Sequence, residues 1–192
     1  MKMVSTRHFH RSRNVCLATI GAGGHALAVI AVAEKAGFNT GCVLGGVYDP
    51  DRREPIAGYS LARKVGDLRD GMASLLALQD NQNRQVFFDS LSKSSLVPLI
   101  ATSSRIAETT TLGLAVQLMP LVALAAETSV GDNTILNSEA VVEDQSQIGS
   151  HCHVSANATI AGNVRVRRRC LVGACMVIIE NTILVDDVVV GA

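Results

Sequence analysis

The sequence predicts two folded parts: a small Rossmann-like parallel sheet with helices, followed by a parallel β-helix of hexapeptide repeats. Two patterns predict this fold class. An aliphatic residue recurs at every sixth position from Ile100 to Val190, and a strand, a glycine-rich turn and a helix follow one another near the start of the chain. We therefore assign residues 14–99 to the first part and residues 100–192 to the second, and we expect residues 1–13 to form a basic leader outside both.

The six-residue period is the most specific pattern in the chain. It differs from the 3.6-residue period of a helix and from the two-residue period of a single strand, and it is typical of solenoids in which three hexapeptides form the three sides of one coil. All sixteen positions of the series are Val, Ile or Leu. We expect these side chains to point into the solenoid, with the small residue four places later, such as Thr128, Ala140 or Cys152, packing beside them at a corner.

The composition excludes several classes of protein. The chain carries 17 Lys and Arg against 17 Asp and Glu, so no net charge favours binding to nucleic acid or to a membrane surface. Its apolar runs are too short to span a bilayer, and residues 1–13 lack the apolar core of a secretion signal. The five cysteines form no CxxC pair, so we expect reduced thiols, no metal site and a cytoplasmic protein.

The first part opens with a strand, a turn and a helix, predicted at residues 15–20, 21–26 and 27–35. This is the first half of a Rossmann-type unit, whose glycines let backbone N–H groups approach a phosphate at the positive end of the helix. Ala26 stands where the dinucleotide pattern has its last glycine, which is a tolerated variant. The pattern alone leaves two interpretations open, a nucleotide site and a tight structural turn.

The remainder of the first part predicts two more strands and two more helices. The strands are expected at residues 41–48 and 74–78, and the helices at residues 67–72 and from Asp80, as N-cap, to about Leu91. The sequence Asp49-Pro50-Asp51 after the second strand suits a contact to a ribose or a base, but it also suits a plain turn.

At this point the chain resembles a known family over nearly its whole length. It is similar to the sialic-acid-synthesis-type and nucleotide-amino-sugar acetyltransferases of bacterial surface-glycan pathways. The segments that carry the resemblance, in order along the chain, are residues 20–26, 46–50, 56–59, 77–84, 135–143, 148–155 and 161–164. The resemblance implies a small Rossmann-like domain before a left-handed β-helix, a cytoplasmic homotrimer, and acetyl-CoA lying along the β-helix between neighbouring subunits.

The resemblance also implies a set of site residues by motif matching. At the sugar-nucleotide site it places Gly23, Gly24, His25, Asp49 and Pro50, with Gln79 where the family motif has a glycine. Along the acetyl-CoA groove it places His153, Ala174 and Ala192, with Asn137 on the coil just below the acyl centre.

The catalytic base is where this chain departs from the family. The family uses a histidine, and Asp144 occupies that position here. An ordinary Asp titrates near 4, so it is a weaker base than imidazole at neutral pH. His153 is a candidate substitute base, and His151 is a weaker one. Both lie at odd offsets from the inward Ile148, so we expect both to face solvent or a subunit interface, and Asp144 could equally be a solvated turn carboxylate.

Three functions remain open from the sequence. The first is an acetyl-CoA-dependent acetyltransferase that acylates an amine or hydroxyl of a nucleotide-linked amino sugar or a sialic-acid-like sugar. The second is a catalytically impaired homologue that binds the sugar nucleotide or acts as a scaffold. The third is an acetyltransferase with another small acceptor, which the Rossmann-like part disfavours. Because Ala192 falls inside a hexapeptide, we also expect a truncated C-terminus, which together with Asp144 favours the second function.

Overall fold

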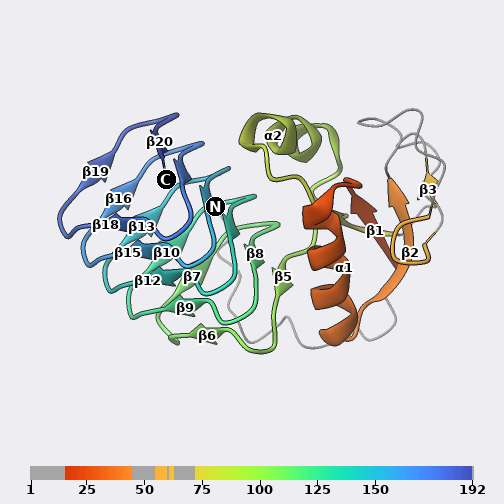
Figure 1. The fold of residues 1–192 in the computed structure, drawn as a ribbon, viewed down its shortest axis with the longest axis horizontal. Helices are drawn as coiled ribbons and strands as arrows, with labels where there is room; N and C mark the ends of the chain where they lie inside the picture. Colours follow the sequence, from red (N-terminus) through yellow and green to blue (C-terminus); the bar gives the residue numbers. More distant parts are fainter. Residues whose placement is uncertain (1–15, 45–54, 60, 63–71, 192) are drawn as a thin grey trace.

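The computed structural model describes residues 16–44, 55–59, 61–62 and 72–191. The α/β unit contains β1 (Cys16–Ile20), α1 (Gly24–Lys35), β2 (Asn39–Leu44), β3 (Leu61–Ala62), β4 (Ala73–Leu76) and α2 (Asn81–Ser90). Its strands form one parallel sheet in the order β3-β2-β1-β4. Figure 1 shows this sheet at one end of the molecule and the solenoid at the other, with α1 between them.

Apolar side chains of α1 join the two parts into one body. Ala26 and Val29 pack in one cluster with Leu17 of β1 on the sheet side and with Leu99 and Met119 on the solenoid side. The other helix adds a second bridge, because Phe87 and Phe88 of α2 pack with residues of the sheet and with Ala115 of the solenoid. The contact between the parts therefore includes two apolar clusters.

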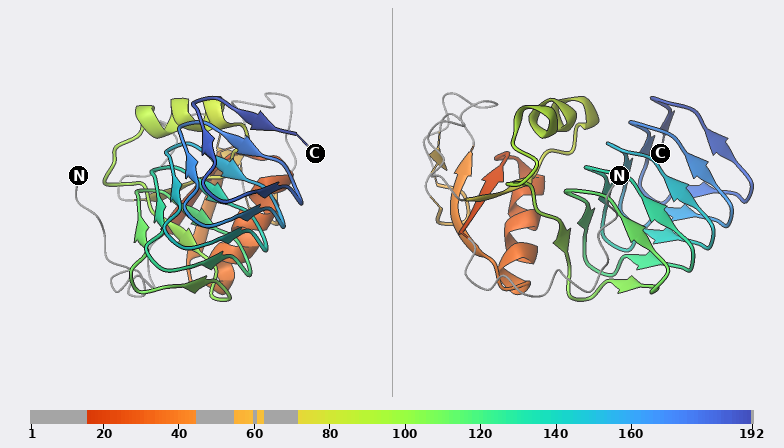
Figure 2. Two further views of the ribbon diagram at one scale, coloured as in Figure 1. Left: turned by 90° about the vertical axis from the view of Figure 1, so that its left-hand side faces the viewer. Right: turned by 180° about the vertical axis from the view of Figure 1, so that it is seen from behind.

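The solenoid is built from sixteen two-residue strands within residues 99–190, which stack as three parallel sheets of five, six and five strands. They are β5 (Leu99–Ile100), β6 (Arg105–Ile106), β7 (Thr111–Leu112), β8 (Gln117–Leu118), β9 (Ala123–Leu124), β10 (Ser129–Val130), β11 (Ile135–Leu136), β12 (Val141–Val142), β13 (Gln147–Ile148), β14 (His153–Val154), β15 (Thr159–Ile160), β16 (Arg165–Val166), β17 (Leu171–Val172), β18 (Val177–Ile178), β19 (Ile183–Leu184) and β20 (Val189–Val190). Each coil takes one strand from each sheet, and Figure 2 shows the coils stacked away from the α/β unit. The arrangement is consistent with a left-handed β-helix.

The interior of the solenoid confirms the six-residue prediction. Every one of the predicted aliphatic positions belongs to a single core cluster, and the four nearest its ends, Ile100, Ile106, Leu184 and Val190, are only partly buried. Repeating one aliphatic residue per side lets each coil fill the narrow space above the last, and this burial is the main stabilising term of the solenoid.

The small residues at the corners explain how the turns are satisfied. Thr134, Ser146 and Cys152 are fully buried, and each donates from its side chain to the carbonyl fifteen residues later in the next coil. A carbonyl at a corner is not part of the backbone hydrogen bonding between strands. The short hydroxyl or thiol beside it therefore donates the hydrogen bond that the carbonyl needs. The preference for small polar residues at this position therefore has a hydrogen-bonding cause as well as a steric one.

A second six-residue series appears in the backbone. From Ala115 to Asp187, every sixth residue has a positive φ, although none of them is glycine. Such a left-handed conformation costs an L-residue about 1–2 kcal/mol, and Asn tolerates it best. Only some of these positions carry Asn or Asp. Leu121, with φ 65°, is a poor choice for this conformation and is also 57% exposed.

We therefore expect Leu121→Asn to raise the free energy of unfolding by about 1 kcal/mol, because it relieves backbone strain without removing core packing. Urea unfolding at pH 7.5 measures the change. The matched control is Val177→Asn, at an exposed strand residue outside the left-handed series. A gain in both variants would mean that removal of exposed apolar surface, and not strain, is responsible.

The α/β unit follows the sequence predictions in part. The first strand is confirmed through Ile20, and α2 begins after Asp80, whose side chain accepts from the backbone N–H of Asn83 at 2.7 Å. The prediction for α1 was wrong at its start, because the helix begins at Gly24 and not at Leu27. The glycine-rich turn is shorter than its composition indicates, and Gly23 is the N-cap.

Other predictions reach beyond the described residues. A complete Rossmann domain is not evident in the part of the chain that the structure describes, which holds a four-stranded parallel sheet and two helices. Residues 1–13, Asp49, Pro50 and Ala192 lie outside the described residues, as does the predicted helix at 67–72 except for Met72, which is not helical. Among the described helices, none combines the length and apolar character that a membrane span requires.

Candidate functional site

The six-stranded sheet of the solenoid faces the α/β unit. The outward side chains of β5, β8, β11 and β14 are buried there, whereas Val189 on β20 is exposed. Gln117, Ile135 and His153 lie side by side on β8, β11 and β14, and each is at most 5% exposed. We call the contact between this sheet and the α/β unit the seam. It is defined by these three residues together with His25 of α1 and Arg84 of α2.

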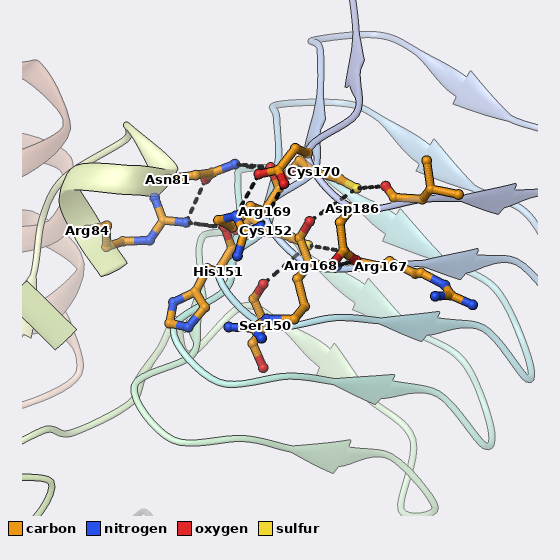
Figure 3. Close-up of polar contacts among 12 residues, drawn as sticks. Asn81, Arg84, Ser150, His151, Cys152, Arg167, Arg168, Arg169, Cys170 and Asp186 are labelled. Carbon is orange, nitrogen blue, oxygen red and sulfur yellow. Dashed lines mark hydrogen bonds and ion pairs between the residues drawn. The ribbon is translucent and has the colours of Figure 1, made fainter. Parts of the chain in front are cut away.

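Arg84 is the most heavily bonded side chain in the seam. Its guanidinium donates to the carbonyls of Leu78, Gln79, Asn133, His151 and Cys152 and to Oδ1 of Asn81, at distances of 2.7–3.2 Å. Figure 3 shows it reaching from α2 toward the backbone of the solenoid. Asn81 adds two bonds in the same direction, to the carbonyls of Arg169 and Cys170.

The charge of Arg84 is held in an unusual way. The side chain is fully buried, and within the described residues each of its bonds ends on a carbonyl or carboxamide oxygen. Burial lowers the pKa of Arg84 to about 10, while the nearby charge of Asp80 opposes that shift. At neutral pH the guanidinium is still a cation, solvated by carbonyl dipoles in place of water.

His153 has a buried ring nitrogen without a partner. Within the described residues nothing bonds its Nε2, which is buried. Burial, followed by the charges of Arg84 and His25, lowers the pKa of His153 to about 3. The imidazole is therefore neutral at pH 7, and it is a weak base with a free polar atom.

His151 is also buried, but it sits in a turn and not on a strand. Its φ is 62°, its ring meets Phe88 edge-on at a centroid distance of 5.3 Å, and its Nδ1 lies 2.8 Å from Nδ2 of Asn133. Burial lowers the pKa of His151 to about 4. The prediction that His151 and His153 face solvent or a subunit interface was wrong. They point out of the solenoid, but the α/β unit covers that face.

His25 connects the glycine-rich turn to the same place. Its Nε2 lies 3.2 Å from Oε1 of Gln117, and Nε2 of Gln117 donates to the Leu76 carbonyl at 2.6 Å. Burial lowers the pKa of His25. Next to it, Gly23 and Gly24 are exposed, and a Cβ on either would meet no heavy atom within 4 Å.

The first turn of α1 lacks the groups that usually neutralise a helix start. It has no side-chain N-cap bond and no acidic residue. Its N–H groups and the helix dipole therefore present an open, positive end. The structure thus brings Gly23, Gly24 and His25 together with His153 around the seam, and Gln79 joins them through its backbone.

Asp144 lies elsewhere on the solenoid. It follows β12, at the edge between the sheets that contain β12 and β13, whereas His153 lies on the third sheet. Its side chain is exposed and borders an open concavity of about 440 Å³. The concavity is lined by Glu143, Asp144, Ala161, Gly162, Asn163, Glu180 and Asn181. Within one chain, Asp144 and His153 are not part of one site.

The remaining predicted residues lie along a different edge. Asn137 follows β11 and Ala174 follows β17, so both sit where the six-stranded sheet meets the sheet of β12. Oδ1 of Asn137 accepts from the N–H of Ser138 at 2.8 Å, and Ala174 is exposed. Asn137 and Ala174 therefore share one edge of the solenoid, next to the sheet that carries His153.

The prediction for the cysteines of the solenoid has a clear outcome. Cys152 and Cys170 are free and fully buried at corners, as predicted. A hydrogen bond with Cys170 and burial raise the pKa of Cys152, so it is a thiol at pH 7. Within the described residues no group of His, Cys, Asp and Glu is arranged to hold a metal ion. Arg169 forms a two-pronged ion pair with Asp187, at 2.6 Å from both Nε and Nη2.

Sequence reasoning missed Arg84 and Gln117 as members of the seam. A signal for Arg84 existed, because it lies three and four residues before Phe87 and Phe88 and so shares the buried face of α2. A charged residue on a buried helix face requires a polar partner on the opposing surface. Nothing in the hexapeptide pattern marks Gln117, since it fills an ordinary outward strand position.

Comparisons with solved structures identify the fold. The acetyltransferase domain of PglB from Neisseria gonorrhoeae FA1090, in complex with acetyl coenzyme A, matches 93% of this chain and 89% of its own, with TM-score 0.83 and 23% identity. PerB from Caulobacter crescentus, in complex with CoA and GDP-perosamine, matches 100% of this chain and 97% of its own, with TM-score 0.75 and 21% identity. WeeI from Acinetobacter baumannii AYE matches 93% of this chain and 89% of its own, with TM-score 0.78 and 17% identity. No protein-family model matches the chain.

The buried histidines predict a pH-dependent stability. Both His151 and His153 have folded-state pKa values below the unfolded value near 6.5, so unfolding takes up protons once the pH falls below 6.5. At pH 5.5 each should lower the free energy of unfolding by about 1.4 kcal/mol relative to pH 7.5 or above, or about 3 kcal/mol together.

Urea unfolding from pH 8 to pH 5.5 measures this dependence, in a range above the ordinary carboxylate pKa values. The control is His153→Gln, which should remove about half of the change between pH 8 and 5.5. A stability that stays flat over this range would contradict the burial of the two imidazoles.

Proposed function

We propose that the protein is an acetyl-CoA-dependent acetyltransferase that acylates an amine or hydroxyl of a nucleotide-linked amino sugar or a sialic-acid-like sugar in bacterial surface-glycan biosynthesis. The observation that carries this proposal is the likeness to sugar acetyltransferase structures over both parts of the chain at once, the α/β unit and the solenoid. A β-helix alone would support acyl transfer but would not indicate the acceptor. The shared α/β unit supports an acceptor that is linked to a nucleotide.

The open start of α1 suits the nucleotide end of such an acceptor. Gly23 and Gly24 leave room for a pyrophosphate, and the N–H groups of the first turn and the helix dipole favour its negative charge. The buried cation of Arg84 adds a positive potential to the same region. Asp49 and Pro50 remain proposed members of this site, outside the described residues.

Acetyl-CoA is proposed to lie along the solenoid near His153, Asn137 and Ala174. The unpartnered Nε2 of His153 gives a bound ligand a polar atom to satisfy. Its lowered pKa makes His153 a poor general base, so we assign it an orienting role and not proton abstraction. Ala192 would fall one coil beyond Ala174 at the same edge.

The separation of Asp144 from His153 supports an assembly in which two chains complete one site. We propose a homotrimer in which the acidic concavity of one subunit faces the seam or the adjoining edge of its neighbour. The acceptor nitrogen or oxygen would bond to the acetyl carbon while the C–S bond of acetyl-CoA breaks, and Asp144 would take the proton that the acceptor loses and pass it to the leaving CoA thiolate. The carboxylates of Glu143 and Glu180 would attract an ammonium form of the acceptor, which must lose a proton before the amine can attack. We propose that the protein acts in the cytoplasm.

The second function, a catalytically impaired protein that binds sugar nucleotide or acts as a scaffold, is favoured by one observation. A carboxylate stands at the base position. It is exposed, and within the described residues no hydrogen bond to its side chain orients it. Loss of a positioned general base typically lowers the rate by about 10²- to 10⁴-fold. An acetyl thioester is already activated, however, so slow acyl transfer through Asp144 remains chemically reasonable.

Release of free CoA from acetyl-CoA, measured against a panel of nucleotide-linked amino sugars and sialic acid, tests the proposal. We expect turnover by the wild type, a fall of about 10²-fold or more in Asp144→Asn because the base is lost, and faster turnover in Asp144→His because imidazole is the better base at pH 7.

His153→Ala is the second arm and should raise the KM for acetyl-CoA more than it lowers kcat. Turnover by Asp144→His alone would favour the catalytically impaired protein. Absence of turnover in all variants, together with absence of CoA binding, would contradict acetyl transfer altogether.

Gly24→Asp tests the nucleotide site separately. A carboxylate in the first turn of α1 should leave the melting temperature unchanged or slightly higher, because it complements the helix dipole and meets no neighbour. It should weaken the binding of UDP- or GDP-linked amino sugars by at least about tenfold, because it repels the pyrophosphate.

Calorimetric titration measures this change, and Gly24→Ala is the matched control with the same loss of backbone freedom and no charge. Equal binding by the two variants would remove the start of α1 from the nucleotide site.

A further inference from the structure

We propose that Gln117 is a positioning residue: it holds the ring of His25 by its Nε2–H group and leaves Nδ1 as the acceptor for a hydroxyl or N–H group of the sugar nucleotide. The inference rests on the proposed function for the identity of that ligand. Its structural content, a side chain of the solenoid that orients an imidazole at the start of α1, concerns the free protein alone.

The first observation is that both ends of the Gln117 carboxamide are bonded, in a way that assigns its atoms. Nε2 of Gln117 donates to the carbonyl of Leu76 at 2.6 Å, and Oε1 lies 3.2 Å from Nε2 of His25. A carbonyl can only accept, so the amino group of the carboxamide must face Leu76 and its oxygen must face His25. That oxygen can only accept as well, so Nε2 of His25 carries the proton.

The state of the other ring nitrogen follows from this bond. Burial lowers the pKa of His25 below its usual value, so the ring is neutral at pH 7.5. A neutral imidazole with its proton on Nε2 has a lone pair on Nδ1. Among the described residues, none bonds Nδ1 of His25. The ring atom left for a ligand is therefore Nδ1.

The second observation is the apolar surrounding of Gln117 on its own sheet. Its neighbours on β5 and β11 are Leu99 and Ile135, and all three side chains are at most 1% exposed. An aliphatic residue would pack there without the cost of burying a carboxamide. Only the two bonds of Gln117 offset that cost, which is the pattern expected of a residue that orients a functional side chain.

The third observation is the place in the sheet where the two bonds meet. Ile20 and Leu76 are the last residues of β1 and β4, and they pair with each other. In the strand order β3-β2-β1-β4, the next strand after β1 lies on one side of it and β4 lies on the other. Ligands of open parallel sheets bind outside the carboxyl ends of the strands at such a point. Gln117 bonds there to the end of β4 and to the first turn of α1.

The chemistry of the ligand follows from the lone pair on Nδ1. This atom accepts a hydrogen bond from a hydroxyl or N–H group and disfavours a phosphate or carbonyl oxygen at the same place. In a sugar nucleotide such donors occur both in the nucleoside and in the amino sugar. Titration with UDP or GDP alone, and with the corresponding UDP- or GDP-linked amino sugar, distinguishes these two sources.

Histidine ¹⁵N–¹H correlation spectra of the ligand-free protein at pH 7.5 test the bond between Gln117 and His25. We expect His25 as Nε2–H, with an Hε2 resonance that is protected from exchange with water. In Gln117→Met, which keeps the length of the side chain and removes both bonds, Hε2 should shift upfield and exchange faster. Leu99→Val is the matched control, because it removes a buried methylene group beside Gln117 without touching either bond.

A wild-type His25 in the Nδ1–H form, or an Hε2 resonance that is unchanged in Gln117→Met, overturns the proposal. The same shift in Leu99→Val would assign the effect to packing and would also overturn it. If Gln117→Met does not fold, the wild-type tautomer and the following variants of His25 decide.

Two amide variants separate the roles of the two ring nitrogens of His25. His25→Gln keeps an N–H donor that reaches Gln117 but has no acceptor at the place of Nδ1. It should keep most of the melting temperature and weaken the binding of a UDP- or GDP-linked amino sugar by about 3- to 10-fold, the worth of one hydrogen bond. His25→Asn keeps an acceptor near the place of Nδ1 but is too short to reach Gln117, so it should lose more melting temperature and less affinity.

Thermal unfolding and calorimetric titration measure these changes. Equal losses of affinity in the two variants, or a greater loss in His25→Asn, would overturn the assignment of Nδ1 to the ligand.

A double-mutant cycle on ligand binding connects Gln117 to the same ring. Gln117→Met should weaken the binding of the UDP- or GDP-linked amino sugar by about threefold or more. In the His25→Ala background the same change should have little further effect, because its action runs through the ring. Additive losses would assign Gln117 a separate role and overturn the proposal.

The spectra and the titrations also separate the two proposals. A wild type that binds no sugar nucleotide, but shows the Gln117-dependent Hε2 resonance, contradicts the proposed function and supports the positioning of the ring by Gln117.

Discussion

The buried guanidinium of Arg84 is the constraint on which the site depends. A cation in a dry seam is costly unless every donor is bonded, and here the acceptors come from both parts of the chain, Leu78 and Gln79 on one side and Asn133, His151 and Cys152 on the other. Separating the α/β unit from the solenoid would leave the charge without the carbonyls of Asn133, His151 and Cys152. The relative position of the two parts is thus fixed by directional bonds in addition to apolar packing.

The solenoid could be predicted from the sequence because its geometry and its sequence share one period. Each coil repeats the same three sides, so one inward aliphatic residue per hexapeptide identifies the fold without long-range information. The α/β unit was predictable where local signals are strong, as at Asp80 and at the buried strand that ends at Ile20. The start of α1 could not be predicted, because the glycine content of a segment does not determine where the turn ends and the helix begins.

The site was less predictable, for a physical reason. Alternation along a strand states that His153 points out of the solenoid, but not which surface covers that face. Only the docking of the α/β unit buries it, lowers its pKa to about 3 and leaves Nε2 without a partner. The position of Asp144 is a similar case. The resemblance assigns it the place of the base and makes His153 a substitute, but it does not tell that the coil geometry puts the two on different sides of the solenoid.

Some features of the seam lower the stability of the fold, and they bear on whether the protein binds ligands. A buried imidazole nitrogen without a partner costs about 1–3 kcal/mol, and an apolar side chain of similar volume at position 153 would avoid that cost. Burial of the Arg84 guanidinium likewise carries a desolvation cost, which its bonds to carbonyls must offset. Such features are expected at a functional site. There, a bound ligand would supply the hydrogen-bond partner that the free polar atom lacks. The seam is therefore consistent with the proposed binding of ligands, and in that proposal Asp144 bears on the rate of the chemical step and not on recognition.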